Sequence, residues 1–181
     1  ELLQAVRDMG FTQPTIVQER TIPLAMQGQD PQSASAKFTD LMVSSQTGSG
    51  KTAAFLLPVL HTLLKQQEAA ANKEREDFEL ACAEATAKGE AVPKRPRRKD
   101  PTSSRNFKAA TPGALVLCPT RELAQQVAND AIDLVQHCRG LRIANIVGGM
   151  PYQLQIAKLQ NANLVVATPG RLLDLQRSMQ I

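Results

Sequence analysis

One short stretch, residues 44–52, constrains the fold of this chain more than any other. It consists of Ser-Ser-Gln-Thr-Gly-Ser-Gly-Lys-Thr and follows the apolar residues 41–43, which predict the end of a buried strand. It leads into residues 52–65, where apolar side chains recur with helical spacing. The glycine-rich loop, as we call residues 44–52, is therefore predicted to join a strand to the start of a helix.

The residue types in this loop suit the binding of a nucleotide phosphate. Backbone N–H groups at a helix start lack intrahelical partners, and the helix dipole favours an anion there. Gly48 and Gly50 allow close backbone approach, Lys51 is predicted to reach the β- and γ-phosphates, and Thr52 to place its hydroxyl on Mg²⁺. The pattern G-x-x-x-x-G-K-[ST] is met except at Ser45. A plain surface turn with a solvated lysine is the competing interpretation, and the strand-loop-helix context favours phosphate binding over it.

Strands and helices alternate over the last third of the chain. This rhythm predicts an α/β fold with a parallel sheet flanked by helices on both faces and ligands beyond the carboxyl ends of the strands. Two helices are predicted before the glycine-rich loop, one ending at Met9-Gly10 and one over residues 14–26. Strands are predicted at 114–118, 142–147 and 164–167, and helices at 121–137, 152–159 and from 171.

Two segments interrupt the pattern and are predicted to be insertions. Residues 31–40 are small and polar, which indicates a loop, and residues 66–112 are long and highly charged. The first half of the longer segment is rich in helix formers and is expected to extend the preceding helix, whereas residues 93–104 are expected to be disordered. The basic residues 93–99 keep three interpretations open: a solvated flexible face, an RNA-binding tether, or a nuclear import signal.

Composition narrows the classes of protein that remain. The 181 residues are 43% hydrophobic and carry a net charge of +4, which suits one globular domain and permits a polyanionic partner. No apolar run approaches the roughly 20 residues needed to cross a bilayer, so we expect a soluble, cytoplasmic protein, or a nuclear one if residues 93–99 serve as an import signal. Cys82, Cys118 and Cys138 lack metal or redox spacing and are expected to be reduced structural thiols; His61 and His137 are assigned no chemistry.

Three further loops are each predicted to follow a strand at the same edge of the sheet as the glycine-rich loop. Arginine side chains offer forked donors to phosphate, threonines offer hydroxyls, and glycines expose backbone N–H groups. Taken singly, the threonines could merely cap helices and the arginines could pair with carboxylates. Together the loops suit a sugar-phosphate backbone. They are Pro119-Thr120-Arg121-Glu122-Leu123-Ala124, Gly148-Gly149-Met150 and Thr168-Pro169-Gly170-Arg171.

In these motifs the chain resembles the amino-terminal part of the DEAD-box RNA helicases. Residues 10–18 resemble the Q motif of that family and residues 45–52 its motif I. Residues 119–124 resemble motif Ia, Gly148-Gly149 the GG motif, and residues 168–171 motif Ib. The resemblance covers most of the chain outside the insertions, and it implies that residues 1–181 are part of a first helicase domain with a RecA-like P-loop NTPase fold.

The resemblance also implies the ligands and the residues that bind them. ATP and Mg²⁺ are the expected cofactors, with Gln18 recognising adenine, Lys51 and Thr52 in catalytic roles, and Thr52 on the metal. RNA is the expected partner, gripped by its backbone with little sequence specificity. The expected nucleotide-binding residues are Gln18, Ser45, Gln46, Thr47, Gly48, Ser49, Gly50, Lys51 and Thr52. The expected RNA-binding residues are Pro119, Thr120, Arg121, Gly148, Gly149, Thr168, Pro169, Gly170 and Arg171.

The sequence also departs from the family pattern. Ser45 stands where motif I usually begins with alanine, and the aromatic residue upstream of the Q motif would precede Glu1. The sequence reaches Ile181 without the Asp-Glu-Ala-Asp box, the Ser-Ala-Thr motif or the second helicase domain. We therefore expect these residues alone to bind nucleotide at most, while the full-length protein couples ATP hydrolysis to RNA duplex unwinding or ribonucleoprotein remodelling. The alternatives are a catalytically silent RNA-binding or scaffold module, and a P-loop ATPase that acts on DNA or protein.

Overall fold

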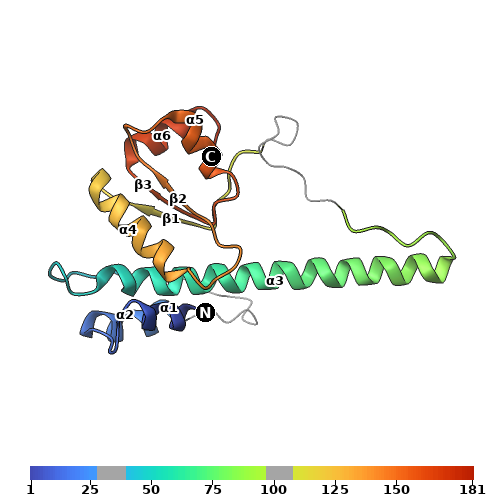
Figure 1. Ribbon diagram of the computed structural model, residues 1–181, viewed down its shortest axis with the longest axis horizontal. Helices are drawn as coiled ribbons and strands as arrows, with labels where there is room; N and C mark the ends of the chain where they lie inside the picture. The colour runs from blue at the N-terminus through green and yellow to red at the C-terminus, as the bar shows by residue number, and fades with distance from the viewer. Residues whose placement is uncertain (28–39, 97–107) are drawn as a thin grey trace.

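The computed structural model describes residues 1–27, 40–96 and 108–181, and Figure 1 shows the order of their elements. Two short helices come first, then one very long helix, and then strands and helices in alternation. The elements are α1 (Leu2–Asp8), α2 (Ile16–Met26), α3 (Lys51–Lys88), β1 (Ala114–Leu117), α4 (Arg121–Leu134), β2 (Ile143–Ile146), α5 (Tyr152–Leu159), β3 (Leu164–Ala167) and α6 (Pro169–Arg177). The predicted α/β alternation is confirmed.

The sheet is parallel and has the strand order β1-β3-β2. Its central strand β3 reads Leu-Val-Val-Ala and is buried along its whole length. A continuous apolar run with β-branched residues fits a strand that is covered on both faces and paired on both edges. In register, Leu164 lies opposite Ala114 of β1 and Ile143 of β2.

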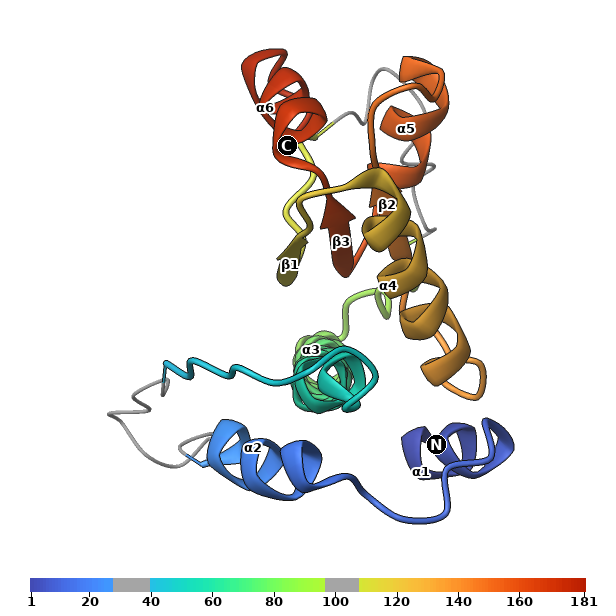
Figure 2. The same cartoon turned by 90° about the vertical axis from the view of Figure 1, so that its left-hand side faces the viewer.

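Side chains of β3 alternate between two cores, one on each face of the sheet. Leu164 and Val166 pack with α3 and α4, whereas Val165 and Ala167 pack with α5 and α6. Figure 2 looks along α3 and shows these layers, with α5 and α6 above the sheet and α3 and α4 below it. The predicted cover on both faces is confirmed.

Helix α3 is much longer than the sheet that it supports. Its buried residues lie mostly before residue 64, with Leu56 and Leu60 fully buried, whereas its second half projects away from the sheet (Figure 1). It ends at Gly89, whose φ of 68° is the left-handed conformation common after helices. The expectation that the first half of the charged segment extends the helix is confirmed.

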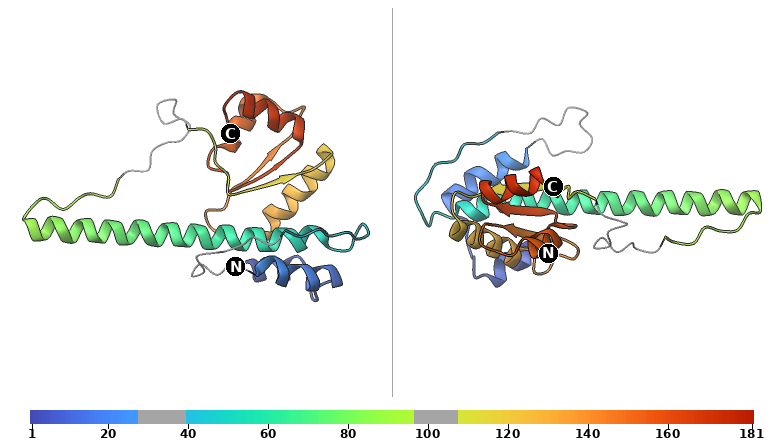
Figure 3. Two further views of the ribbon diagram at one scale, coloured as in Figure 1. Left: turned by 180° about the vertical axis from the view of Figure 1, so that it is seen from behind. Right: turned by 90° about the horizontal axis from the view of Figure 1, so that it is seen from above.

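The charged segment leaves the domain and returns to it at one place. A Cβ added to Gly113 would lie 2.6 Å from Leu63 Cδ2 and 3.6 Å from Gln66 Oε1, so the residue before β1 touches the point where α3 leaves the core. Figure 3 shows from two sides how the second half of α3 extends away from the sheet. Most of the short insertion at 31–40 and most of residues 93–104, the stretch expected to be disordered, lie outside the described residues, so these two expectations stay predictions.

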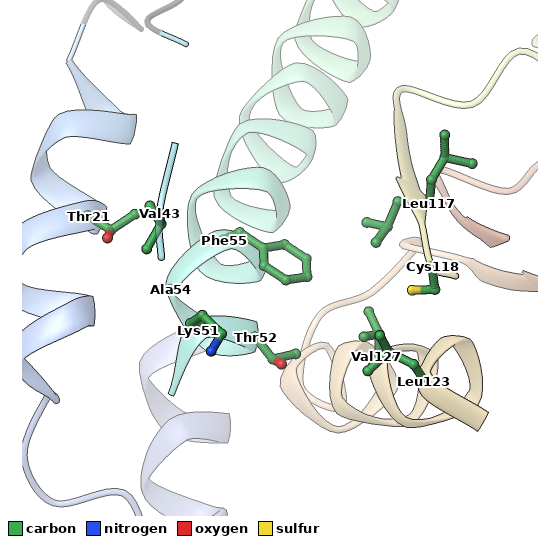
Figure 4. Close-up of a pocket in the computed structure, with 11 residues that line it drawn as sticks. Thr21, Val43, Lys51, Thr52, Ala54, Phe55, Leu117, Cys118, Leu123 and Val127 are labelled. Carbon is green, nitrogen blue, oxygen red and sulfur yellow. The ribbon is translucent and has the colours of Figure 1, made fainter. Parts of the chain in front are cut away.

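The strand predicted at residues 41–43 is wrong. These residues take no part in the sheet, and Met42 is 100% exposed. In Figure 4, Val43 lies beside Thr21 of α2, with Phe55 of α3 between it and Leu117 of β1. A strand needs a hydrogen-bonded neighbour as well as apolar side chains, and this segment pairs with no strand, so among the described residues the outer edge of β1 stays open. Leu115 and Leu117 at that edge are accordingly 48% and 56% exposed.

Helix boundaries shift by a few residues from those predicted. Helix α4 ends at Leu134 rather than near His137, because the chain turns through Val135 to Cys138. Helix α6 begins at Pro169 rather than Arg171, because proline suits the first helical turn, where its missing N–H is not needed. Within the described residues, none of the helices has the length and apolar character needed to cross a membrane.

Candidate functional site

The glycine-rich loop turns sharply into α3. Gly48 has a φ of 81° and Gly50 a φ of 84°, both in the left-handed region that other residues rarely adopt. Ser49 N–H donates to the Gln46 carbonyl at 3.3 Å, which closes the turn, and Gly50 is the N-cap of α3. The predicted loop and helix start are confirmed, although the described residues directly before them, 40–43, form no strand.

The start of α3 offers unpaired donors to an anion. Gly50 supplies no side-chain cap, so the backbone N–H groups of the first helical turn keep their need for an acceptor. Among the residues that the structure describes, the buried hydroxyl of Ser49 has no hydrogen-bond partner. A phosphate group placed here would satisfy both, because its oxygens accept several hydrogen bonds at once. The residues present therefore fit a nucleotide phosphate.

Lys51 folds back over its own loop. Its Nζ donates to the carbonyl of Ser45 and, at 2.8 Å, to the carbonyl of Gln46. The ammonium group thus lies over the turn, where two backbone oxygens hold it. Phosphate oxygens carry more charge than carbonyl oxygens, and charge-assisted bonds are the stronger ones, so a bound nucleotide can draw the ammonium away from these carbonyls.

Gln18 connects the second helix to the glycine-rich loop. Its Nε2 donates to the carbonyl of Gly50 at 3.2 Å, and its Oε1 accepts from the backbone N–H of Thr15 at 3.0 Å. Thr15 Oγ1 in turn accepts from the Gln18 N–H, which completes a capping box at the start of α2. A Cβ at Gly50 would lie 2.6 Å from Gln18 Nε2, so only glycine fits this contact.

These contacts leave the Gln18 amide able to bind a further partner. A carboxamide has two N–H donors and an oxygen with two lone pairs, and the contacts above use one of each. The predicted role of Gln18 in adenine binding is compatible with this geometry and stays a prediction.

A cavity of about 310 Å³ lies between α3, β1 and the start of α4 (Figure 4). Lys51 and Thr52 line one side of it, and Leu117 and Cys118, at the carboxyl end of β1, line the other. The glycine-rich loop therefore lies at the end of the sheet where the strands finish. Most of the lining is apolar, so the body of this cavity does not suit a triphosphate. Burial raises the pKa of the Cys118 thiol, which suits its predicted structural role.

The loop after β1 and the loop after β2 touch each other. A Cβ at Gly149 would come within 2.8 Å of Arg121 Nη1, so the guanidinium lies directly over that glycine. Gly149 also has a φ of 83°. The positive φ requires glycine there, whereas the exposed end of Arg121 could shift away from a Cβ. The structure brings together residues that the sequence predicted as separate RNA contacts.

The loop after β3 joins the same group through Arg171. Its Nη1 donates to the Met150 carbonyl at 3.1 Å and to Gln155 Oε1 at 3.0 Å. Its guanidinium carbon lies 5.6 Å from the centre of the Tyr152 ring, within the range of a cation-π contact. Arg171 is therefore half-buried and partly engaged within the protein rather than wholly free for a ligand.

Thr120 and Thr168 both precede helices but differ in their bonds. Thr120 Oγ1 accepts from Leu123 N–H at 3.2 Å and caps α4, as the capping alternative predicted. Thr168 occupies the N-cap of α6 without a side-chain cap bond. In the part of the chain that the structure describes, neither Arg121 nor Arg171 pairs with a carboxylate. That alternative is wrong for the arginines.

Gln155 and Tyr152 were not predicted as site residues, and Met150 was predicted only as part of the loop Gly148-Gly149-Met150. Gln155 is fully buried, although glutamine is usually exposed. Its position on α5 was a usable signal, because Gln155 lies one helical turn before Leu159, which packs into the core. Met150 contributes only a backbone carbonyl, which no side-chain pattern reveals.

No metal centre built from protein ligands is found within the described ranges: they hold no group of three or more His, Cys, Asp and Glu side chains suited to one. The predicted Mg²⁺ contact of Thr52 would instead require a bound nucleotide to supply most ligands, as is usual for this ion. Thr52 lies in the first turn of α3, beside Lys51 at the mouth of the cavity.

Comparison with known proteins agrees with this geometry. The family model for DEAD/DEAH box helicases matches residues 15–180. The chain is 38% identical over 175 residues to DEAD-box ATP-dependent RNA helicase 52A of Oryza sativa subsp. japonica. This match covers 96% of this chain and 23% of that protein. It is 39% identical over 175 residues to ATP-dependent RNA helicase SrmB of Haemophilus influenzae, and that match covers 96% of this chain and 29% of that protein. The chain thus spans less than a third of these curated relatives.

Solved structures show the same fold. A hypothetical ATP-dependent RNA helicase from Sulfolobus tokodaii superposes with a TM-score of 0.63 at 33% identity, over 99% of this chain and 37% of that one. S. cerevisiae Dbp5, solved with Nup159, Gle1, IP6 and ADP, superposes with a TM-score of 0.61 at 26% identity. That match covers 99% of this chain and 34% of the Dbp5 chain. The fold is that of a RecA-like helicase domain, as predicted. Given its sequence motifs, its fold and the span of the family match, the chain belongs to the DEAD/DEAH box helicase family.

Proposed function

We propose that the full-length protein is an ATP-dependent RNA helicase, and that this chain carries its phosphate loop and part of its RNA-binding surface. One observation carries the proposal. The glycine-rich loop and the loops bearing Arg121, Gly149 and Arg171 all lie where the parallel strands finish. Ligands of open α/β sheets bind at that edge.

For the nucleotide, the proposal assigns ATP with Mg²⁺ to the start of α3. The N–H groups of the first turn and the Ser49 hydroxyl would hold the phosphates, and Lys51 would exchange its two carbonyl partners for phosphate oxygens. Mg²⁺ would neutralise phosphate charge, with Thr52 as the ligand from this chain. Gln18 would read the adenine edge with the donor and acceptor positions that Thr15 and Gly50 leave free.

For RNA, the proposal assigns a grip on the backbone rather than on bases. Arg121 is exposed over Gly149, and Thr168 has a hydroxyl without a capping bond. Arg171 uses Nη1 inside the protein, which leaves Nη2 and Nε for a phosphate. Such contacts bind without sequence preference and weaken with salt.

The test is RNA-stimulated ATP hydrolysis and duplex unwinding by the full-length protein, with Lys51→Ala and Lys65→Ala compared. Lys65 lies on the same helix but is exposed and away from the loop, so its replacement controls for charge alone. We expect Lys51→Ala to weaken nucleotide binding by about 1.5–3 kcal/mol and to abolish measurable turnover. Lys65→Ala should behave as the parent.

Two outcomes would redirect the proposal. RNA binding without any ATP hydrolysis by the parent protein would favour the silent RNA-binding module. ATP hydrolysis stimulated by DNA or protein, but not by RNA, would favour the other P-loop ATPases. Equal activity of the parent and Lys51→Ala would refute the assignment of the phosphate site.

We further propose a cytoplasmic location, with the nucleus as the alternative if residues 93–99 act as an import signal. Fluorescence microscopy of the tagged full-length protein, with and without the basic residues of that stretch changed to alanine, distinguishes the two. Nuclear signal that disappears in the variant would establish the alternative.

A further inference from the structure

We infer that Gln155 is a positioning residue that holds two of the proposed RNA-binding loops in one fixed arrangement. This inference rests on the proposed function and adds to it a residue that contacts no ligand. Gln155 lies on α5, which packs against β2 and has its N-terminus close to the glycines that follow that strand.

The side chain of Gln155 is fully buried and uses both ends of its amide. Nε2 donates to the carbonyl of Val147, directly before Gly148-Gly149. Oε1 accepts from Arg171 Nη1 at 3.0 Å. One side chain therefore joins the loop after β2 to the first turn of α6, which follows β3.

A second bond closes the connection. The same Nη1 of Arg171 donates to the Met150 carbonyl at 3.1 Å, so the loop after β2 is held before and after its glycines. Tyr152 packs its ring on the guanidinium. With Nη1 engaged by these two acceptors, Nη2 and Nε remain as the donors of Arg171 for a phosphate. The guanidinium of Arg121, on α4, lies over Gly149 in the loop after β2. The position of that loop therefore also limits where the Arg121 side chain can lie.

The role depends on the amide and not on the volume of Gln155. An apolar side chain of similar size would fill the space but would leave the Val147 carbonyl and one N–H of Arg171 without these partners. Buried polar groups left unpaired destabilise the local arrangement, so the loop would move to find other partners. Gly148 and Gly149 carry no side chains that could hold it in place.

Gln160 offers a matched comparison within the chain. It is also a buried glutamine, 9% exposed, at the end of the same helix. Its Nε2 has no hydrogen-bond partner within residues 1–27, 40–96 and 108–181, and Gln160 is not in the connection between the loops. Replacing Gln160 removes the same chemical group from the same helix without touching the Val147, Met150 or Arg171 contacts.

The experiment compares Gln155→Met with Gln160→Met in the full-length protein. Single-stranded RNA affinity is measured by fluorescence anisotropy over a series of KCl concentrations, together with nucleotide affinity and hydrogen exchange at residues 148–150. For Gln155→Met we expect RNA affinity to fall roughly tenfold, since two buried bonds are lost. We expect a shallower salt dependence, because fewer phosphates are contacted, and faster exchange at 148–150. Nucleotide affinity should stay unchanged, and Gln160→Met should match the parent in every measurement.

Gln155→Glu is a second variant that tests the inference in case Gln155→Met does not fold. Its carboxylate still accepts from Arg171 but cannot donate to the Val147 carbonyl. We expect fast exchange at 148–150 and an RNA affinity below that of the parent.

The inference is overturned if both Gln155 variants keep parental RNA affinity, salt dependence and exchange. It is equally overturned if nucleotide affinity falls as far as RNA affinity, since that marks general destabilisation. If the parent protein binds no RNA at all, the proposed function fails, and exchange at 148–150 still decides whether Gln155 holds the loop.

Discussion

Gly50 is the residue at which the two halves of the proposed nucleotide site meet. It caps α3 with a positive φ, and its carbonyl accepts from Gln18 Nε2. Any side chain there meets Gln18 and Thr15, since a Cβ would lie 2.6 Å from Gln18 Nε2 and 3.0 Å from Thr15 Oγ1. The sequence motif predicted the glycine, but only the structure shows that the close approach is to the second helix as well as to a ligand.

Gly50→Ala should therefore destabilise the protein and weaken nucleotide binding. The left-handed backbone alone costs about 1–2 kcal/mol for a residue with a Cβ, and the contact with Gln18 adds to it. Gly48→Ala is the control, because Gly48 has a similar φ of 81° but open space around its Cβ position. Chemical denaturation and nucleotide titration measure both variants. Equal losses for the two would show that the Gln18 contact contributes nothing.

Gln18→Ala should impair nucleotide selection more than folding. The capping box keeps Thr15 Oγ1 on the residue 18 N–H after the change, so α2 loses only part of its cap. A lost base contact weakens ATP binding by about 1–3 kcal/mol and reduces the preference for ATP over GTP. Competition titrations with both nucleotides measure this, with the exposed Gln13→Ala as control. An unaltered preference would remove Gln18 from adenine recognition.

At the scale of elements, helix propensity predicted the charged segment better than apolar character predicted the strand at residues 41–43. The helical half of residues 66–112 followed from its Ala, Glu, Lys and Arg content, because local propensity decides an exposed helix. Residues 41–43 were predicted as a strand from apolar character alone, and that failed because a strand depends on a neighbour that composition cannot supply. The convergence of Arg121 with Gly149, and of Arg171 with Met150, depends on loop geometry and was beyond sequence reasoning.

The projecting half of α3 should be dispensable for the fold. Beyond Leu63 and Leu64 it contributes little to either core, and Gly113 lies against Gln66 where the chain returns. Replacing residues 68–111 by a short Gly/Ser linker should change the free energy of unfolding by no more than about 2 kcal/mol, since loop length enters only logarithmically. Nucleotide affinity should persist.

Denaturant unfolding of the shortened protein measures this. A control with a linker of the same composition but twice the length separates strain in the linker from loss of the segment. Failure of both forms to fold would make the charged segment part of the domain rather than an insertion.

At the scale of the molecule, one edge of one sheet gathers every proposed ligand contact. The glycine-rich loop faces the carboxyl end of β1 across a cavity, and the loops after all three strands approach each other nearby. The opposite end of the sheet and the projecting half of α3 carry none of the predicted site residues. ATP and RNA on this domain would therefore bind at the same edge of the sheet.

Hydrogen-deuterium exchange of the full-length protein, with and without single-stranded RNA and with and without ADP, tests this arrangement most directly. We expect ADP to protect residues 46–52 and RNA to protect residues 119–123, 148–150 and 168–171. Protection by RNA that is confined to the distal half of α3, or to the opposite end of the sheet, would contradict it.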